Sequence, residues 1–353
     1  MDPVFNFNQN TVENTIINHP ANRSCEKLLI KAIQTGKTRR NKDKDHLTES
    51  FQKLITELYD EENTTFGSGV VGMAWRLEWI VKKKLFLGFD LHEVEGILED
   101  VDNFIYKRTI YQNASDFSLA DGLLGDLYYL VNRLDRISPE VKKIPIAKCI
   151  FILIDRLSTA FSAIASSNVG SSKNVNDWST DQLKFISQLF HILSFVPFLP
   201  YTEYGVIQQL IDKMSNFIKY LFIESLDMHS DQISQERYID LLMLSACYHN
   251  VGKKLKIGRW EKRGKQYTAH YISLINFDKV FSPAYAEKFL RVYGLIVSSG
   301  VAIEINAKIL IEKLWTEYLS SNQIRNDLLE VIMGGNAKPG HAAMISDLQL
   351  VSI

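Results

Sequence analysis

Hydrophobic residues recur at helical spacing along most of this chain, three or four positions apart. This interval places apolar side chains on one face of an α-helix. It is clearest in residues 207–222, and it extends to residues 91–108, 238–248, 284–297 and 302–319. No convincing block alternates with the period of two that is typical of a β-strand. The pattern therefore predicts an all-α protein.

Two glycine pairs interrupt this pattern in the same way. Gly69 and Gly72 stand one helical turn apart at the start of an apolar helix, and Gly122 and Gly125 repeat the arrangement. Glycine in a helix costs roughly 1 kcal/mol relative to alanine, so pairs in these positions indicate a close approach to the backbone. The helix predicted for residues 91–108 separates the two copies. A repeated helical pair of this kind is typical of a solenoid or a closed helical ring.

The stretches that carry this repeat resemble the lanthionine synthetase C-like family, in its Bacteroidetes-type branch. They read FGSGVVGMAWRLEWI, DLHEVEGILEDVDNFIYKR and SLADGLLGDLYYLVNRL, in that order, and the similarity is clear over residues 65–134. The resemblance implies a single α/α-toroid domain over residues 1–353, with inner helices ringed by outer helices and glycine-rich turns at the inner-helix ends. It also implies a role in the maturation of ribosomally made peptides.

Three further segments complete the expected ring. Residues 1–60 lack a recognisable glycine turn and are predicted to form an atypical first hairpin, as terminal repeats often do. Residues 166–181 are rich in Ser, Asn and Gly and are predicted to form a long polar loop. The stretch around Gly340 and His341 resembles the glycine turn of the family's last hairpin, where an inner-helix mouth would face the centre of the ring.

The resemblance also bears on metal binding, because the family's zinc enzymes use two cysteines and a histidine. Their zinc lowers the pKa of a substrate thiol, which then adds to a dehydrated serine or threonine. The corresponding positions here, near residues 230–237 and 282–299, contain neither cysteine nor histidine. We therefore expect no cofactor, and zinc only if weak candidates such as Cys247 and His341 rebuild a site. Cys247 and His249 lie about 200° apart around a helix axis, so both cannot face one ion.

Asp121 and Asp126 flank the second glycine pair. An inward pair of carboxylates is what a hydrolase on a related helical toroid would use. Carboxylates near a helix N-terminus are also favoured by its partial positive charge, and this structural role is our preferred interpretation. Motifs of other enzyme classes are not found in the sequence.

Composition and charge bear on where in the cell the protein is expected to lie. The 353 residues are 46% hydrophobic with a formal net charge of -1, which gives no bulk attraction to nucleic acid or to an anionic membrane. Three scattered cysteines suit a reducing cytoplasm, and the polar N-terminus lacks the pattern of a signal peptide. No run approaches about 18 uncharged apolar residues. We therefore expect a cytoplasmic protein without membrane insertion.

One short segment departs from the near-neutral net charge of the whole chain. Seven Lys or Arg residues and a single Glu fall within residues 253–265. We interpret this segment first as a solvated face and otherwise as a surface for an acidic peptide or a partner enzyme. The candidate contacts are Lys254, Arg259, Trp260 and Arg263. No nucleic-acid-binding motif accompanies them.

Together these features predict a degenerate, non-catalytic member of the lanthionine synthetase C-like family. It would bind a precursor peptide, a peptide-modifying enzyme, or both. An active zinc-dependent lanthionine cyclase is the first alternative, and the carboxylate-using hydrolase is the second. The candidate cavity residues are Gly69, Gly72, Asp121, Gly122, Gly125, Asp126, Gly340 and His341.

Overall fold

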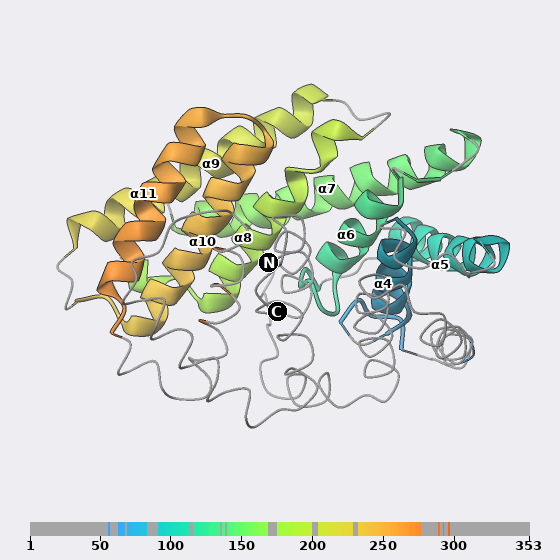
Figure 1. Ribbon diagram of the computed structural model, residues 1–353, viewed down its shortest axis with the longest axis horizontal. Helices are drawn as coiled ribbons and strands as arrows, with labels where there is room; N and C mark the ends of the chain where they lie inside the picture. The colour runs from blue at the N-terminus through green and yellow to red at the C-terminus, as the bar shows by residue number, and fades with distance from the viewer. Residues whose placement is uncertain are drawn as a thin grey trace, which may run out of the picture.

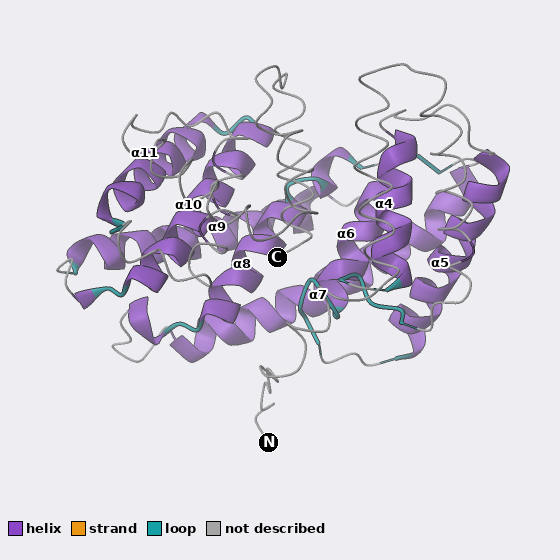
Figure 2. Cartoon of the chain, turned by 60° about the horizontal axis from the view of Figure 1, so that its bottom comes forward, coloured by secondary structure: helices purple, strands orange, loops and turns teal. Residues whose placement is uncertain are grey.

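The computed structural model describes most of the chain between residues 63 and 276. The described residues are 63–67, 69–82, 91–112, 116–134, 136–137, 140–168, 175–199, 204–228 and 232–276, with the single positions Thr56, Phe289, Val292 and Ile296. Within these residues helices are joined by short loops and no strand occurs (Figure 2). The prediction of an all-α protein is therefore confirmed.

The helices follow the order that the hydrophobic pattern predicts. Their bounds are α4 Val70–Lys82, α5 Leu91–Tyr111, α6 Leu123–Leu134, α7 Glu140–Asn168, α8 Thr180–Leu193, α9 Tyr204–Asp227, α10 Gln235–Lys254 and α11 Gly258–Leu274, with the short 3-10 helices η1 Val175–Asp177 and η2 Val196–Phe198. Phe289, Val292 and Ile296 are also helical. The segments predicted at 1–60, 302–319 and 334–344 lie outside the described residues, apart from Thr56.

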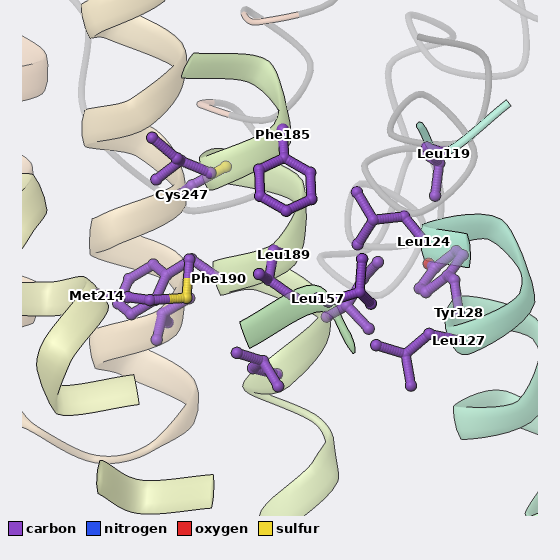
Figure 3. Packing of buried hydrophobic residues seen from close by; sticks show 14 of the residues in the cluster. Leu119, Leu124, Leu127, Tyr128, Leu157, Phe185, Leu189, Phe190, Met214 and Cys247 are labelled. Atoms are coloured by element: carbon purple, nitrogen blue, oxygen red, sulfur yellow. The ribbon is translucent and has the colours of Figure 1, made fainter. Parts of the chain in front are cut away.

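Alternate helices form two rows (Figure 1). α4 packs on α6, α6 on α8 and α8 on α10, so these four helices are successive neighbours. In the second row, α5 packs on α4, α7 on α5 and α6, α9 on α8 and α10, and α11 on α10. The core lies between the rows, and α7 contributes Leu157 at the place where α6 and α8 approach each other (Figure 3).

The glycine turns show why these residues must be glycine. At each of the four positions the chain folds back so that the carbonyl oxygen of the residue six positions earlier lies against the glycine. An added Cβ would therefore approach that oxygen far more closely than real Cβ atoms do. The distances from an ideal Cβ are 2.2 Å for Gly69 to Asn63, 1.8 Å for Gly72 to Phe66, 2.4 Å for Gly122 to Asp116 and 2.5 Å for Gly125 to Leu119.

The two turns are also built from the same hydrogen bonds. Asn63 and Asp116 are equivalent, at an offset of 53 positions that also relates 69 to 122 and 72 to 125. Each accepts one backbone amide on its side-chain oxygen and a second on its carbonyl oxygen. The amides are those of Thr65 at 3.0 Å and Val70 at 2.8 Å in the first turn, and of Ser118 at 2.7 Å and Leu123 at 3.0 Å in the second.

The connection between α7 and α8 is shorter than the polar loop predicted at 166–181. α7 continues to Asn168, and α8 begins at Thr180 after its capping residue Ser179. Trp178 is only 2% exposed, so the end of this connection is held in the core. Composition alone could not predict this, because one buried indole outweighs the surrounding polar residues.

A buried ion network ties α4, α5 and α6 together. Arg133 of α6 is 1% exposed, and its guanidinium lies 3.0 Å from Asp102, 3.4 Å from Glu78 and in contact with Glu95. Arg136 donates to both carboxylate oxygens of Glu78 at 2.8 Å. Glu78 comes from α4 and the other two acids from α5, so the network fixes three helices at once.

α7 is the one helix among the described residues that is long and apolar enough to cross a membrane. The stretch is Val141–Ser166, with a mean hydropathy of 1.6, and 44% of the 18-residue window that defines it is buried inside the protein. A single helix of this kind carries little weight, because core helices of soluble proteins have the same length and composition. The prediction that the protein does not insert into a membrane stays a prediction.

Candidate functional site

The two glycine turns lie side by side at the N-terminal ends of α4 and α6. The amide of Gly67 donates to the carbonyl of Ala120 at 2.6 Å, and an ideal Cβ on Gly125 would lie 2.4 Å from the Cβ of Phe66. Both glycine pairs are thus at helix starts, as predicted, and the two turns pack directly on each other. That they face a common central cavity stays a prediction.

The two carboxylates beside the second turn have separate partners. The Asp121 side chain is hydrogen-bonded to Thr65 in the first turn, and burial raises its pKa. Asp126 is 1% exposed and forms an ion pair with Arg108 of α5. Burial raises the pKa of Asp126 to about 6, although Arg108 acts in the opposite direction. These separate contacts favour structural roles for both carboxylates, and the carboxylate-using hydrolase stays a prediction.

Cys247 lies in the packing between α10 and α8 (Figure 3). It is fully buried, and burial raises the pKa of its thiol to about 12. The Nδ1 atom of His249 lies 2.9 Å from the Glu261 carbonyl oxygen of α11. Within the described part of the chain, no three His, Cys, Asp or Glu residues gather as metal ligands. The other weak candidate, His341, lies outside that part together with Gly340.

The stretch near residues 230–237, where the resemblance would place the first zinc turn, contains the capped N-terminus of α10. The Oγ atom of Ser234 accepts the amide of Arg237 at 3.2 Å at the beginning of α10. The Arg237 guanidinium contacts the Trp178 carbonyl and lies 3.1 Å from Asp240. Thr180 of α8 donates to the same Asp240 at 3.0 Å. Side chains therefore join α8 to α10 where glycine turns join α4 to α6.

The predicted role of Trp260 in partner contact is wrong. Trp260 is 1% exposed, and its ring centroid lies 6.1 Å from that of Phe190 in α8 and 5.7 Å from that of Tyr248 in α10. Helical spacing places Trp260 on the inner face of α11, while its basic neighbours Arg259 and Arg263 are exposed. The indole fills the core beneath a basic outer face.

Like Trp260, Lys254 lies away from this basic outer face. Its ammonium lies over the ring of Phe195, beside a group of residues that the sequence did not single out. We call this group the central cluster. Its members come from α4, α6, α10 and the C-terminal part of α8 with the turn after it, and they are Trp75, Tyr128, Gln188, His191, Phe195 and Lys254.

Aromatic contacts hold the central cluster together. Trp75 stacks on Tyr128 with ring centroids 5.4 Å apart and planes inclined by 26°. Phe195 meets Tyr128 edge to face at 6.4 Å and His191 at 5.2 Å. The cluster therefore brings together all four helices of the first row.

Four buried polar atoms in the central cluster have no hydrogen-bond partner among the described residues. They are Trp75 Nε1, Gln188 Nε2 and both ring nitrogens of His191, on side chains that are 1%, 4% and 7% exposed. Leaving one such group unpaired costs about 1–3 kcal/mol. A cavity with room for about one water molecule adjoins Gln188 and His191, and its lining also includes Leu119, Tyr128 and Ile192. Unpaired groups gathered beside one cavity call for a bound water or ligand, which makes the central cluster the candidate binding site.

The electrostatics of the central cluster favour binding over proton transfer. Burial, and to a lesser degree the charge of Lys254, lowers the pKa of His191 to about 3. His191 is therefore uncharged at neutral pH and offers one N–H donor and one acceptor. A base with such a low pKa is poorly matched to general acid–base catalysis near pH 7.

One feature of the sequence could have indicated the central cluster. Trp75 and Tyr128 occupy equivalent positions, each six residues after the first glycine of its turn. An aromatic residue at the same position of both copies indicates that the two side chains lie close together in the fold. His191 and Lys254 had no such signal, because α8 and α10 do not begin with a glycine pair.

Comparison of the chain with protein-family models, with curated proteins and with solved structures finds no match. The structure itself defines an all-α protein in which a glycine-turn and helix unit is repeated and alternate helices share a polar and aromatic cluster. Membership of the lanthionine synthetase C-like family stays a prediction, which rests on the quoted motifs and their order.

Proposed function

We propose that this protein is a helical toroid of the lanthionine synthetase C-like type that binds a peptide during peptide maturation without catalysing a reaction. The row α4, α6, α8 and α10 would supply inner helices of the ring, and α5, α7, α9 and α11 would supply outer helices. A precursor peptide, or a segment of a modifying enzyme, would be the ligand. The buried free thiols of Cys149 and Cys247 fit a cytoplasmic location.

The central cluster carries this proposal. Its buried rings supply apolar surroundings, while Gln188 and His191 offer uncharged hydrogen-bonding groups of the kind that pair with peptide amides. Lys254 supplies a positive charge beside them, which suits a carboxylate of the ligand. A group of buried, unpaired polar atoms lowers the stability of the free protein, and a peptide that pairs them would recover this free energy on binding.

The test replaces the unpaired groups with apolar residues of similar size. Gln188→Leu with His191→Leu is expected to weaken binding of the precursor peptides encoded beside this gene at least tenfold, about 1.4 kcal/mol. The free energy of unfolding should stay unchanged or rise, because the unsatisfied atoms are removed. Fluorescence anisotropy and chemical denaturation measure the two quantities.

Ser187→Ala is the matched control, because its hydroxyl is buried in the same helix but donates to the Leu183 carbonyl at 2.7 Å. It should leave peptide affinity unchanged. The proposal fails if the wild-type protein binds none of these peptides. It also fails if the double variant is folded and binds them as tightly as the wild type.

A second expectation separates this proposal from the zinc-dependent cyclase. The isolated protein should contain no stoichiometric zinc, and Cys247 should resist thiol reagents until the protein unfolds, since burial disfavours its thiolate. Elemental analysis and thiol titration of a Cys25→Ser variant provide the measurements. About one zinc per chain that is lost in Cys247→Ser or His341→Ala, but retained in Cys149→Ser, would contradict this expectation and favour the zinc-dependent cyclase.

A further inference from the structure

The outer sides of α9 and α11 form one surface that the sequence did not place together. The ring of Phe222 in α9 lies 4.3 Å from that of Tyr267 in α11. Ser225 and Tyr271 are hydrogen-bonded through their hydroxyls at 2.5 Å. These contacts keep the two helices side by side, so residues on their outward faces are neighbours.

Three cations gather on this surface. Arg259 and Arg263, one turn apart on α11, are exposed, and Lys219 of α9 lies close enough that their charges act on it. The pKa of Lys219 is lowered by burial and by both arginines, with Asp212 acting in the opposite direction. No ion pair to any of the three is found among the described residues, and the Lys219 ammonium donates only to Asn216 at 3.0 Å. The three like charges therefore repel one another, and Asp212 offsets this repulsion at Lys219 only in part.

Apolar side chains stand beside these cations. Tyr220, Ile223 and Leu226 lie three positions apart on α9 and are 48%, 55% and 45% exposed. Apart from Val206 near its start, which is 57% exposed, the other large apolar residues of α9 are mostly buried, and the helix packs against α8 and α10. Tyr220, Ile223 and Leu226 differ, because these large apolar side chains remain in contact with water next to the three cations.

We infer that the α9–α11 surface, formed by Lys219, Tyr220, Ile223, Leu226, Arg259 and Arg263, docks an acidic amphipathic helix of a partner protein. Carboxylates on such a helix would relieve the repulsion among the three cations, and its apolar side would cover the row on α9. An anionic membrane is less well matched, because the apolar row is short and the protein as a whole has a formal net charge of -1. This surface is separate from the central cluster and extends beyond the proposed peptide-binding function.

The probe is a labelled peptide of roughly five helical turns, with leucines at helical spacing on one side and glutamates on the other. Fluorescence anisotropy should show binding that weakens as ionic strength rises from about 0.05 M to about 0.5 M, because screening shortens the reach of the charges. A peptide of the same composition in scrambled order should bind at least tenfold more weakly, since it cannot place its leucines on one side.

Two variants test the two halves of the surface. Reversing the charges with Lys219→Glu, Arg259→Glu and Arg263→Glu is expected to weaken binding at least tenfold, and the remaining binding should no longer weaken as salt is added, because the surface now repels the acidic probe. Tyr220→Ser with Ile223→Ser should weaken binding while retaining the salt dependence. Lys107→Glu with Lys148→Glu, at exposed lysines of α5 and α7, is the charge-reversal control away from this surface and should bind within twofold of wild type. Circular dichroism confirms that each variant is folded.

Three results would overturn the inference. The first is wild-type binding no tighter than that of the triple charge reversal, and the second is equal binding of the scrambled peptide. The third is binding to vesicles of anionic phospholipid with no binding of the peptide, which would assign the surface to a membrane. Gln188→Leu with His191→Leu should leave binding of this probe unchanged, so failure here is distinguishable from failure of the proposed function.

Discussion

Gly72→Ala is expected to destabilise the protein by about 3 kcal/mol or more. An ideal Cβ at this position lies 1.8 Å from the Phe66 carbonyl oxygen and 3.3 Å from the Arg76 guanidinium. The first obstacle is backbone, so the turn or the start of α4 must move. Overpacking of this kind typically costs about 1–3 kcal/mol and sometimes more. The loss should also disturb the second turn, because Phe66 packs against Gly125.

Gly96→Ala is the matched control. Gly96 lies inside α5 and is exposed, and nothing lies within 4 Å of its ideal Cβ. Alanine is the better helix former by about 0.8–1 kcal/mol, so this substitution should stabilise the protein. Urea denaturation of the two variants gives both changes in the free energy of unfolding. Equal effects of the two substitutions would contradict the close approach at the first turn.

Arg133→Met is expected to cost about 3–5 kcal/mol, because removing one partner of a buried ion network leaves the others uncompensated. The guanidinium is 1% exposed and joins Glu78 of α4 to Glu95 and Asp102 of α5. Methionine preserves much of the side-chain volume, so the loss is electrostatic. Burial already raises the pKa of Asp102 to about 6 despite the positive charge of Arg133. Without Arg133, that pKa should rise further.

The control for this substitution is Lys142→Met, which breaks the surface pair between Lys142 and Glu99. Their side chains are 46% and 38% exposed, and exposed pairs contribute about 0–1 kcal/mol. The comparison uses chemical denaturation at neutral pH. If Arg133→Met were no more destabilising than Lys142→Met, the network would not fix α4, α5 and α6 as described.

The helices and glycine turns could be predicted because they depend on short sequence intervals. The apolar positions of residues 207–222 fall on one face, and α9 forms around them as Tyr204–Asp227. Likewise Gly69 and Gly122 are constrained by carbonyl groups six residues earlier. Signals of this kind are local, so one sequence is sufficient to detect them.

The central cluster could not be predicted in the same way. His191 lies in α8 and Lys254 at the end of α10, and only the packing of alternate helices brings both to Phe195. The error at Trp260 has a related cause. Its cationic neighbours suggested exposure, whereas the helical register of α11 turns the indole inward onto Phe190 and Tyr248. A charge run describes one face of a helix and not every residue within it.

The contact between the two glycine turns has a consequence for the growing chain on the ribosome. Gly67 donates to Ala120, and the ring of Phe66 packs against Trp75 and Tyr128 with centroids 6.0 and 5.9 Å apart. The contacts to Ala120 and Tyr128 therefore cannot form until the second copy has been synthesised, which takes several seconds at about 5–20 residues per second. During that interval Phe66 and Trp75 are exposed to solvent and available to chaperones. A nascent chain halted between the two copies should consequently be aggregation-prone, whereas one halted after α6 should not.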